Sequence, residues 1–226
     1  NTEPKEYDES ISSLTVGGDG SSLQIKQVTE KDIAEIKKLP YVESVKANYQ
    51  LNVRYITRVG EKQYTLSSQA YTPGQKPDIE AGILPKEGDL KPGQITLPFG
   101  YIKSLGFKSS NDALGKEVQI NIQKPFADNT GNQLLDAIKE GRDISELKPE
   151  SETRTYMVAA VTKKAATSID FGTLPVFMSD QDAKSIYDYT TVGTTSFGKY
   201  SFVTARIKDG KNKEKIAAAQ KDLKSK

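Results

Sequence analysis

The chain of 226 residues has no cysteine, no histidine and no tryptophan. These absences exclude a Ser-His-Asp triad, a thiolate nucleophile and a metal site built on histidine or cysteine ligands. They also remove the only side chain whose unperturbed pKa lies near neutrality, which is the most common acid–base catalyst. The composition therefore favours a binding or force-transmitting domain over an enzyme, and we expect no catalytic residue, no cofactor and no metal.

The chain also lacks long apolar runs and any strong excess of one charge. Its longest apolar stretches, such as residues 157–161, are far shorter than the ~20 residues that span a bilayer. The 32 basic and 30 acidic residues give a net charge of +2, without the clustered basic surface of a nucleic-acid-binding protein. Only residues 211–226 are rich in lysine. Such a segment fits a helix beside a membrane as well as a solvated helix face.

Two features bear on where the chain works. A protein without cysteine fits the outside of a bacterial cell, where free thiols are a liability, and fits a small cytosolic protein equally well. Because the chain begins with Asn1 rather than methionine, we expect it to have been cut from a longer protein or processed.

The opening third predicts a β–α–β–β order. Thr29 followed by Asp32 is a helix-capping pattern, and apolar residues at 33, 36 and 39 repeat at helical spacing until Pro40 ends the helix. Alternating apolar residues predict strands at 11–16, 41–46, 50–59 and 63–71. We expect residues 1–10, which are polar, to be frayed.

The middle of the chain predicts a loop region that separates two lobes of the fold. Residues 72–93 are rich in proline and glycine and read as a loop. A short helix over 99–105 is stopped by Gly106, and a strand follows over 114–122. Residues 125–152 read as a polar surface insertion with one weak helix over 132–140.

The closing third predicts a β–β–α–β–α order. Strands are expected at 154–162, 174–178 and 200–207. Ser179 with Asp182 forms a second cap, which opens a helix through residue 189, and a final helix begins near residue 212.

Several residue pairs have the spacing of known catalytic motifs. Ser196 and Lys199 match a Ser-x-x-Lys nucleophile, and Ser109 with Asn111 matches its Ser-x-Asn partner. In the enzymes that use them, Ser-x-x-Lys opens a helix and comes first, whereas here it enters a strand and comes second. We interpret this spacing as chance.

Carboxylates offer two further candidates. Asp180 with Asp182, and Asp128 and Asn129 before Gly131, suggest calcium, but neither continues into a twelve-residue loop with a terminal Glu. Roles in caps and turns are therefore favoured. The pair formed by Glu150 and Glu152 lies in the polar insertion, and nothing places the two across a cleft.

Six segments of the chain share a pattern of short motifs: residues 28–45, 88–97, 105–106, 113–120, 156–161 and 201–207. Together they resemble the extracytoplasmic domain of MacB/FtsX-type ABC transporter permeases, in which the counterpart of residues 28–45 follows the first membrane helix. The order and spacing of these motifs carry the resemblance, which spans residues 11–123 and 154–226. The sequence departs from the pattern at Ala160, where the family has glycine, and over 124–152.

The resemblance implies an α+β fold with two lobes. A porter-like lobe of two βαβ units would be built from both chain ends, residues 11–70 plus 154–226. A second, mostly β lobe, residues 71–153, would be inserted into it. The β–α–β–β and β–β–α–β–α thirds agree with this arrangement.

The resemblance also implies a role. The chain would be an extracellular permease domain that transmits conformational change across the membrane and contacts an adaptor protein or an exported substrate, such as a peptide or antibiotic. Its partners would be a second permease copy, an ATP-binding subunit reached through the membrane domain, and a membrane fusion (adaptor) protein. It would lie on the extracytoplasmic side of the cell membrane, in a Gram-positive type of cell. The alternative is a stand-alone peptide- or sugar-binding module at the cell surface.

Overall fold

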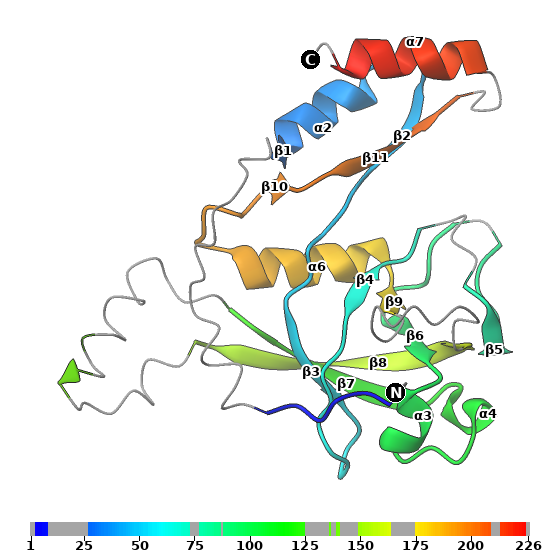
Figure 1. Ribbon diagram of the computed structural model, residues 1–226, viewed down its shortest axis with the longest axis vertical. Helices are drawn as coiled ribbons and strands as arrows, with labels where there is room; N and C mark the ends of the chain where they lie inside the picture. The colour runs from blue at the N-terminus through cyan, green and yellow to red at the C-terminus, as the bar shows by residue number, and fades with distance from the viewer. Residues whose placement is uncertain are drawn as a thin grey trace. The chain divides into compact units, whose positions relative to one another are not determined.

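The computed structural model describes residues 3–8, 27–72, 77–86, 88–124, 136, 139–140, 149–163, 175–208 and 213–224. The chain divides into two compact units. The larger unit comprises Asn1–Asp19 and Leu51–Thr195, and the smaller unit comprises Gly20–Gln50 and Ser196–Lys226. Both units combine helices and strands, so the predicted α+β class is confirmed (Figure 1).

The smaller unit joins segments from both parts of the sequence through two antiparallel strand pairs. β1 pairs with β10, and β2 pairs with β11. The side chains of Val42, Val45 and Ala219 are buried in this unit. Its elements in chain order are β1 (Val28–Thr29), α2 (Glu30–Lys37), β2 (Val42–Ala47), β10 (Lys199–Tyr200), β11 (Val203–Ile207) and α7 (Lys213–Lys224).

The cap predicted for the first helix is present at the start of α2. The backbone N–H of Thr29 donates to the carboxylate of Asp32 at 2.8 Å, and the N–H of Asp32 donates to the Thr29 hydroxyl at 3.3 Å. This reciprocal arrangement satisfies two of the backbone donors that a helix start leaves without partners. The capping prediction is confirmed.

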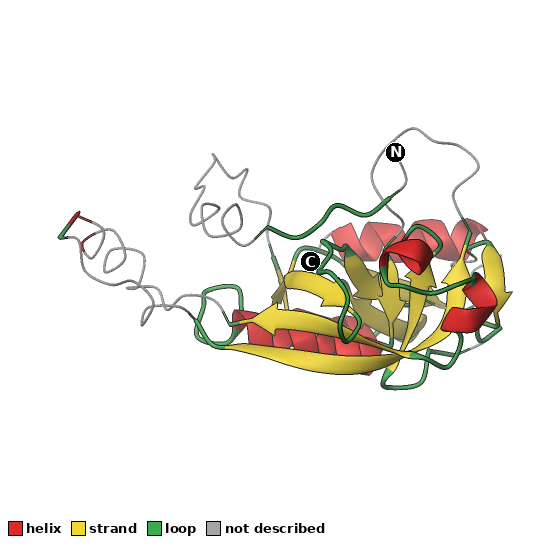
Figure 2. Cartoon of the chain, turned by 90° about the horizontal axis from the view of Figure 1, so that it is seen from below, coloured by secondary structure: helices red, strands yellow, loops and turns green. Residues whose placement is uncertain are grey.

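The larger unit is built on a mixed sheet in the order β3-β7-β8-β6-β9-β4, with β5 paired to β8. β8 is the longest strand and lies antiparallel to β7 and parallel to β6. α6 packs on this sheet and contacts β4 and β7 (Figures 1 and 2). The strands are β3 (Val53–Thr57), β4 (Ser68–Ala70), β5 (Ile79–Gly82), β6 (Gln94–Pro98), β7 (Glu117–Gln123), β8 (Ser151–Thr162) and β9 (Val176–Met178), and the helices are α3 (Tyr101–Ser104), α4 (Ser110–Ala113) and α6 (Asp180–Thr191).

The core of the larger unit follows from the alternation of apolar residues in β7. Val118, Ile120 and Ile122 are fully buried, because every second residue of a strand points to the same face of the sheet. Ile186 of α6 is also fully buried. The helix predicted to begin after Ser179 thus covers the apolar side of the sheet.

The division between units differs from the boundaries expected from the sequence. Residues 51–70 and 154–195 were expected in the lobe built from the chain ends, but they belong to the larger unit. The physical reason is strand pairing: β3 forms a ladder with β7, and β8 pairs with three strands of the same sheet. The smaller unit has one β–α–β segment, β1-α2-β2, whereas its second half runs β10-β11-α7.

Several other local predictions agree with the structure only in part. The loop expected over 72–93 contains β5, and α4 precedes the predicted strand at β7. The N-terminal residues expected to be frayed pair with the chain near residue 64, where the Tyr7 N–H donates to the Gln63 carbonyl at 2.8 Å. The strand expected at 11–16 and nearly all of the helix expected at 132–140 lie outside the described residues.

None of the helices in the described part of the chain is both long enough and apolar enough to cross a membrane.

Candidate functional site

The residues with the spacing of a catalytic serine and lysine have structural roles. Ser109 lies before α4, and its hydroxyl accepts from the backbone N–H of Asp112 at 3.2 Å. The backbone N–H of Lys199 donates to the carbonyl of Ser196 at 3.1 Å, which closes a turn before β10. Ser109 and Asn111 belong to the larger unit and Ser196 and Lys199 to the smaller one.

The aspartates considered as calcium ligands fix the start of α6. The carboxylate of Asp182 accepts from the Gly93 N–H at 2.8 Å and from the Ser179 hydroxyl at 2.6 Å. The N–H of Asp180 donates to the carboxylate of Asp89 at 2.7 Å. Among the residues that the structure describes, no group of three or more acidic side chains is arranged to hold a metal ion. Asp128, Asn129 and Gly131 lie outside the described residues.

The two glutamates of the polar segment are paired with basic side chains. The ammonium of Lys124 lies 2.5 Å from the Glu150 carboxylate, and the guanidinium of Arg154 lies 2.5 Å from the Glu152 carboxylate. The hydrogen bond from Lys124 lowers the pKa of Glu150. A carboxylate held ionised in this way is unsuited to act as a general acid near neutral pH.

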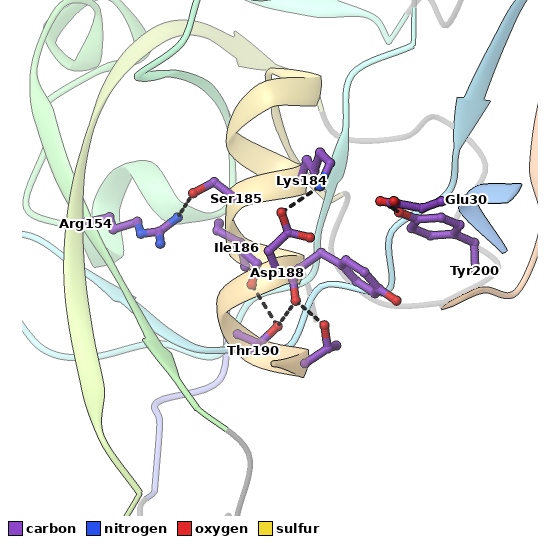
Figure 3. A network of polar contacts seen from close by, with 10 residues as sticks. Glu30, Arg154, Lys184, Ser185, Ile186, Asp188, Thr190 and Tyr200 are labelled. Carbon is purple, nitrogen blue, oxygen red and sulfur yellow. Dashed lines mark hydrogen bonds and ion pairs between the residues drawn. The ribbon is translucent and has the colours of Figure 1, made fainter. Parts of the chain in front are cut away.

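These ion pairs belong to a polar network between the sheet and α6. The Arg154 guanidinium donates to the Ser185 hydroxyl at 3.0 Å, as Figure 3 shows. Arg154 and Lys124 also lie over the ring of Tyr189, at 5.7 and 5.5 Å from its centroid. Cations over an aromatic face are attracted by the ring quadrupole, so Tyr189 joins α6 to the adjoining ends of β7 and β8.

Buried tyrosines predict how the larger unit responds to alkaline pH. Burial raises the pKa of Tyr156, and the charge of Asp182 raises it further. A pKa that is raised by folding gives stability that is present below the unfolded pKa and is lost as the pH rises through the folded pKa. We expect the free energy of unfolding to fall above about pH 10, by up to ~1.4 kcal/mol per pH unit for each such tyrosine.

Urea unfolding between neutral and strongly alkaline pH measures this effect. Tyr156→Phe removes the titrating hydroxyl, so its free energy of unfolding should fall less steeply with pH than that of the wild type. Comparing each protein with its own value at neutral pH removes any constant effect of the lost hydroxyl. Equal slopes for the two proteins would contradict the assignment.

A hollow of about 600 Å³ lies beside α3 and α4 in the larger unit. We call it the α3 hollow. Three aromatic or aliphatic side chains line it, namely Phe99, Ile102 and Phe107. Charged side chains of both signs also line it: Glu3, Glu80, Lys103 and Lys108. Its volume falls in the range of small-ligand pockets, and the combination of apolar surface with a few charged groups is typical of them.

The segment that lines the α3 hollow is held in place by contacts with other parts of the larger unit. Tyr101 is fully buried, and its hydroxyl donates to the Thr65 carbonyl at 2.7 Å. The Phe107 N–H donates to the Ile102 carbonyl at 2.9 Å. The Arg58 guanidinium lies 4.6 Å from the centroid of the Phe107 ring. The apolar surface is therefore preformed.

A second hollow, of about 380 Å³, lies along β7 and is lined by Arg58, Lys116 and Glu117 among others. Arg58 is already engaged there, because it stacks on Phe107 and donates to the Gly106 carbonyl at 3.3 Å. The α3 hollow is the better candidate for a ligand. Sequence reasoning missed it, although the spacing of Phe99 and Lys103 places both on one side of a helical turn.

Comparisons with known proteins give likenesses in structure only. No protein-family model matches the chain, and no curated protein matches its sequence. The chain is similar to the extracellular domain of the noncanonic ABC-type transporter YknZ from Gram-positive bacteria, at 15% identity and a TM-score of 0.44, covering 85% of this chain and 78% of that one. It is similar to the periplasmic region of MacB from Actinobacillus actinomycetemcomitans, at 14% identity and a TM-score of 0.46, covering 92% and 78%. Both belong to the class that the sequence motifs resemble.

Proposed function

We propose that the chain is the extracytoplasmic domain of an ABC transporter permease and transmits conformational change across the membrane. The observation that carries this proposal is that the smaller unit is built from two segments far apart in the sequence. It joins residues near 45 to residues near 205 in one ladder, with Val45 opposite Ala205, and the larger unit is inserted between them in the sequence. The resemblance described above places a membrane helix on each side of such a domain. Two flanking segments joined in one unit would move together.

The proposed mechanism assigns different tasks to the two units. The smaller unit would receive the movement of the membrane helices, and the larger unit would contact an adaptor protein or an exported substrate. A second permease copy and an ATP-binding subunit would complete the transporter. The chain itself would have no catalytic role, because the ATPase would be a separate subunit or domain.

The location can be tested in intact cells. The chain contains no cysteine, so an Ala217→Cys substitution gives this domain a single thiol, and Ala217 is exposed on α7. Any cysteine elsewhere in the full-length protein is first replaced by serine, which makes position 217 the unique label site. We expect a membrane-impermeant maleimide to label it equally in intact and permeabilised cells. Labelling only after permeabilisation would contradict an extracytoplasmic location.

Force transmission can be tested in the β2–β11 ladder. Val45 is buried and its neighbour Ser44 is exposed. An unpaired carboxylate in the buried position costs several kcal/mol, so Val45→Asp should disrupt the smaller unit. We expect transport by the full-length protein to fall at least tenfold while ATP hydrolysis continues.

Ser44→Asp is the matched control, because it places the same charge on the exposed side of the same strand. It should transport like the wild type. Immunoblotting of membranes shows whether the two variants reach equal amounts. If Val45→Asp transports as well as Ser44→Asp at equal amounts, the smaller unit does not transmit the movement.

A further inference from the structure

We propose that the α3 hollow binds a short apolar peptide that carries a free ammonium group and a free carboxylate. The proposal adds a ligand class to the role suggested above, and it does not require that role to be correct. It rests on two features of the hollow: charged groups of opposite sign that do not pair with one another, and an apolar surface held in place from behind.

The charges of the hollow are available to a ligand. Glu3, Glu80, Lys103 and Lys108 have exposed side chains. None of these side chains forms a hydrogen bond or an ion pair with another residue in the described part of the chain. Their carboxylate and ammonium groups are therefore separated by more than the 4 Å of an ion pair. A single ligand that carries an ammonium group and a carboxylate would pair with both the glutamates and the lysines of the hollow.

The apolar surface of the hollow indicates that the part of the ligand between its two charged groups is apolar. Phe99 remains 49% exposed although its neighbour Ile102 is 5% exposed. An aromatic ring that is half exposed beside a preformed hollow offers an apolar ligand a large contact area. A neutral sugar would leave the lysines and glutamates without charged partners. A peptide of two or three apolar residues supplies the apolar side chains and both terminal charges.

Isothermal titration calorimetry with the 226-residue chain tests the proposal. The probe is a tripeptide of leucine and phenylalanine with free termini, and we expect a Kd below about 1 mM. Acetylating its amino end or amidating its carboxyl end should each weaken binding about tenfold, because each removes a charge-assisted contact.

Substitutions in the hollow identify which charge meets which end. In the double variant Lys103→Gln and Lys108→Gln, the free and the amidated peptide should bind equally. In Glu80→Gln, the free and the acetylated peptide should differ less than they do with the wild type. Lys91→Gln is the control, because Lys91 is exposed and does not line the hollow. It should keep the full preference for free termini.

A matched pair of substitutions tests the apolar contact separately. Phe99→Ala should weaken binding of the free tripeptide at least tenfold, whereas Ile83→Ala should leave it unchanged, since Ile83 is 84% exposed and lies outside the hollow. Circular dichroism of both variants shows whether the fold is kept.

Three results would overturn the inference: no binding at about 10 mM tripeptide, equal binding of free and capped peptides to the wild type, or equal binding to Phe99→Ala and Ile83→Ala. None of them would affect the labelling and transport tests of the proposed function, so the two proposals can fail separately.

Discussion

Gly82→Ala is expected to destabilise the larger unit by about 3 kcal/mol. Gly82 has a φ of +82°, and a Cβ added there would lie 2.4 Å from the Ala159 carbonyl oxygen and 2.8 Å from the Ala160 Cα. The left-handed backbone costs an alanine about 1–2 kcal/mol, and forcing an atom against a packed backbone costs about 1–3 kcal/mol more. The clash falls on the pairing of β5 with β8, where Gly82 lies opposite Ala160.

Native-state hydrogen exchange measures this cost within one sample. A loss of about 3 kcal/mol speeds exchange of the most protected β7 amides roughly a hundredfold, while amides of β2 in the smaller unit should be unaffected. Gly60→Ala is the matched control, since Gly60 also has a positive φ, +83°, but has no atom within 4 Å of the added Cβ. We expect it to cost only about 1 kcal/mol. Equal costs for the two variants would show that β5 does not approach β8 as closely as the structure has it.

Asp182→Ala should cost the larger unit about 2–3 kcal/mol. Asp182 caps α6 together with Ser179 and also accepts the Gly93 N–H. The N–H of residue 182 still donates to the Ser179 hydroxyl in the variant, but the bond from that hydroxyl to the carboxylate and the negative charge in the first turn are lost. This loss costs about 1 kcal/mol. Leaving a half-buried backbone donor without its charged acceptor adds about 1–2 kcal/mol. The segment over 89–93 should therefore lose one of its two attachments to the helix, while the bond from the Asp180 N–H to the Asp89 carboxylate remains.

Asp188→Ala on the same helix is the control. Asp188 forms an ion pair with Lys184 at 2.7 Å, but both side chains are more than a third exposed. Solvent-exposed pairs of this kind contribute about 0.5 kcal/mol. Chemical unfolding followed by circular dichroism should therefore separate the two variants clearly. If they have the same midpoint, Asp182 does not hold the loop.

The local signals in the sequence were sufficient where the contacts are local. The caps at Thr29 and Ser179 each involve a partner three residues away, so spacing alone predicts them. Gly106 likewise has the positive φ, +72°, that a helix-ending glycine adopts. The alternation of β7 predicts which side of the strand is buried, because it depends only on the pleat.

The sequence could not predict which strands pair. β5 lies in a segment rich in proline and glycine, and it is a strand because β8 supplies hydrogen bonds from about 80 residues further along the chain. The unit boundaries fell elsewhere for the same reason, since β3 pairs with β7 rather than with β2. Pairing depends on residues far apart in sequence, which periodicity does not relate.

The candidate site shows the same limit. The sequence alone determined what chemistry is missing, because a chain without histidine and cysteine cannot supply those side chains whatever its fold. It also fixed the resemblance to permease domains, which rests on the order of short motifs. Only the tertiary structure decided that Glu3, Glu80 and Lys103 line one hollow with Phe99. They come from an N-terminal segment, a strand and a helix, and the folding of the larger unit is what brings these distant segments together.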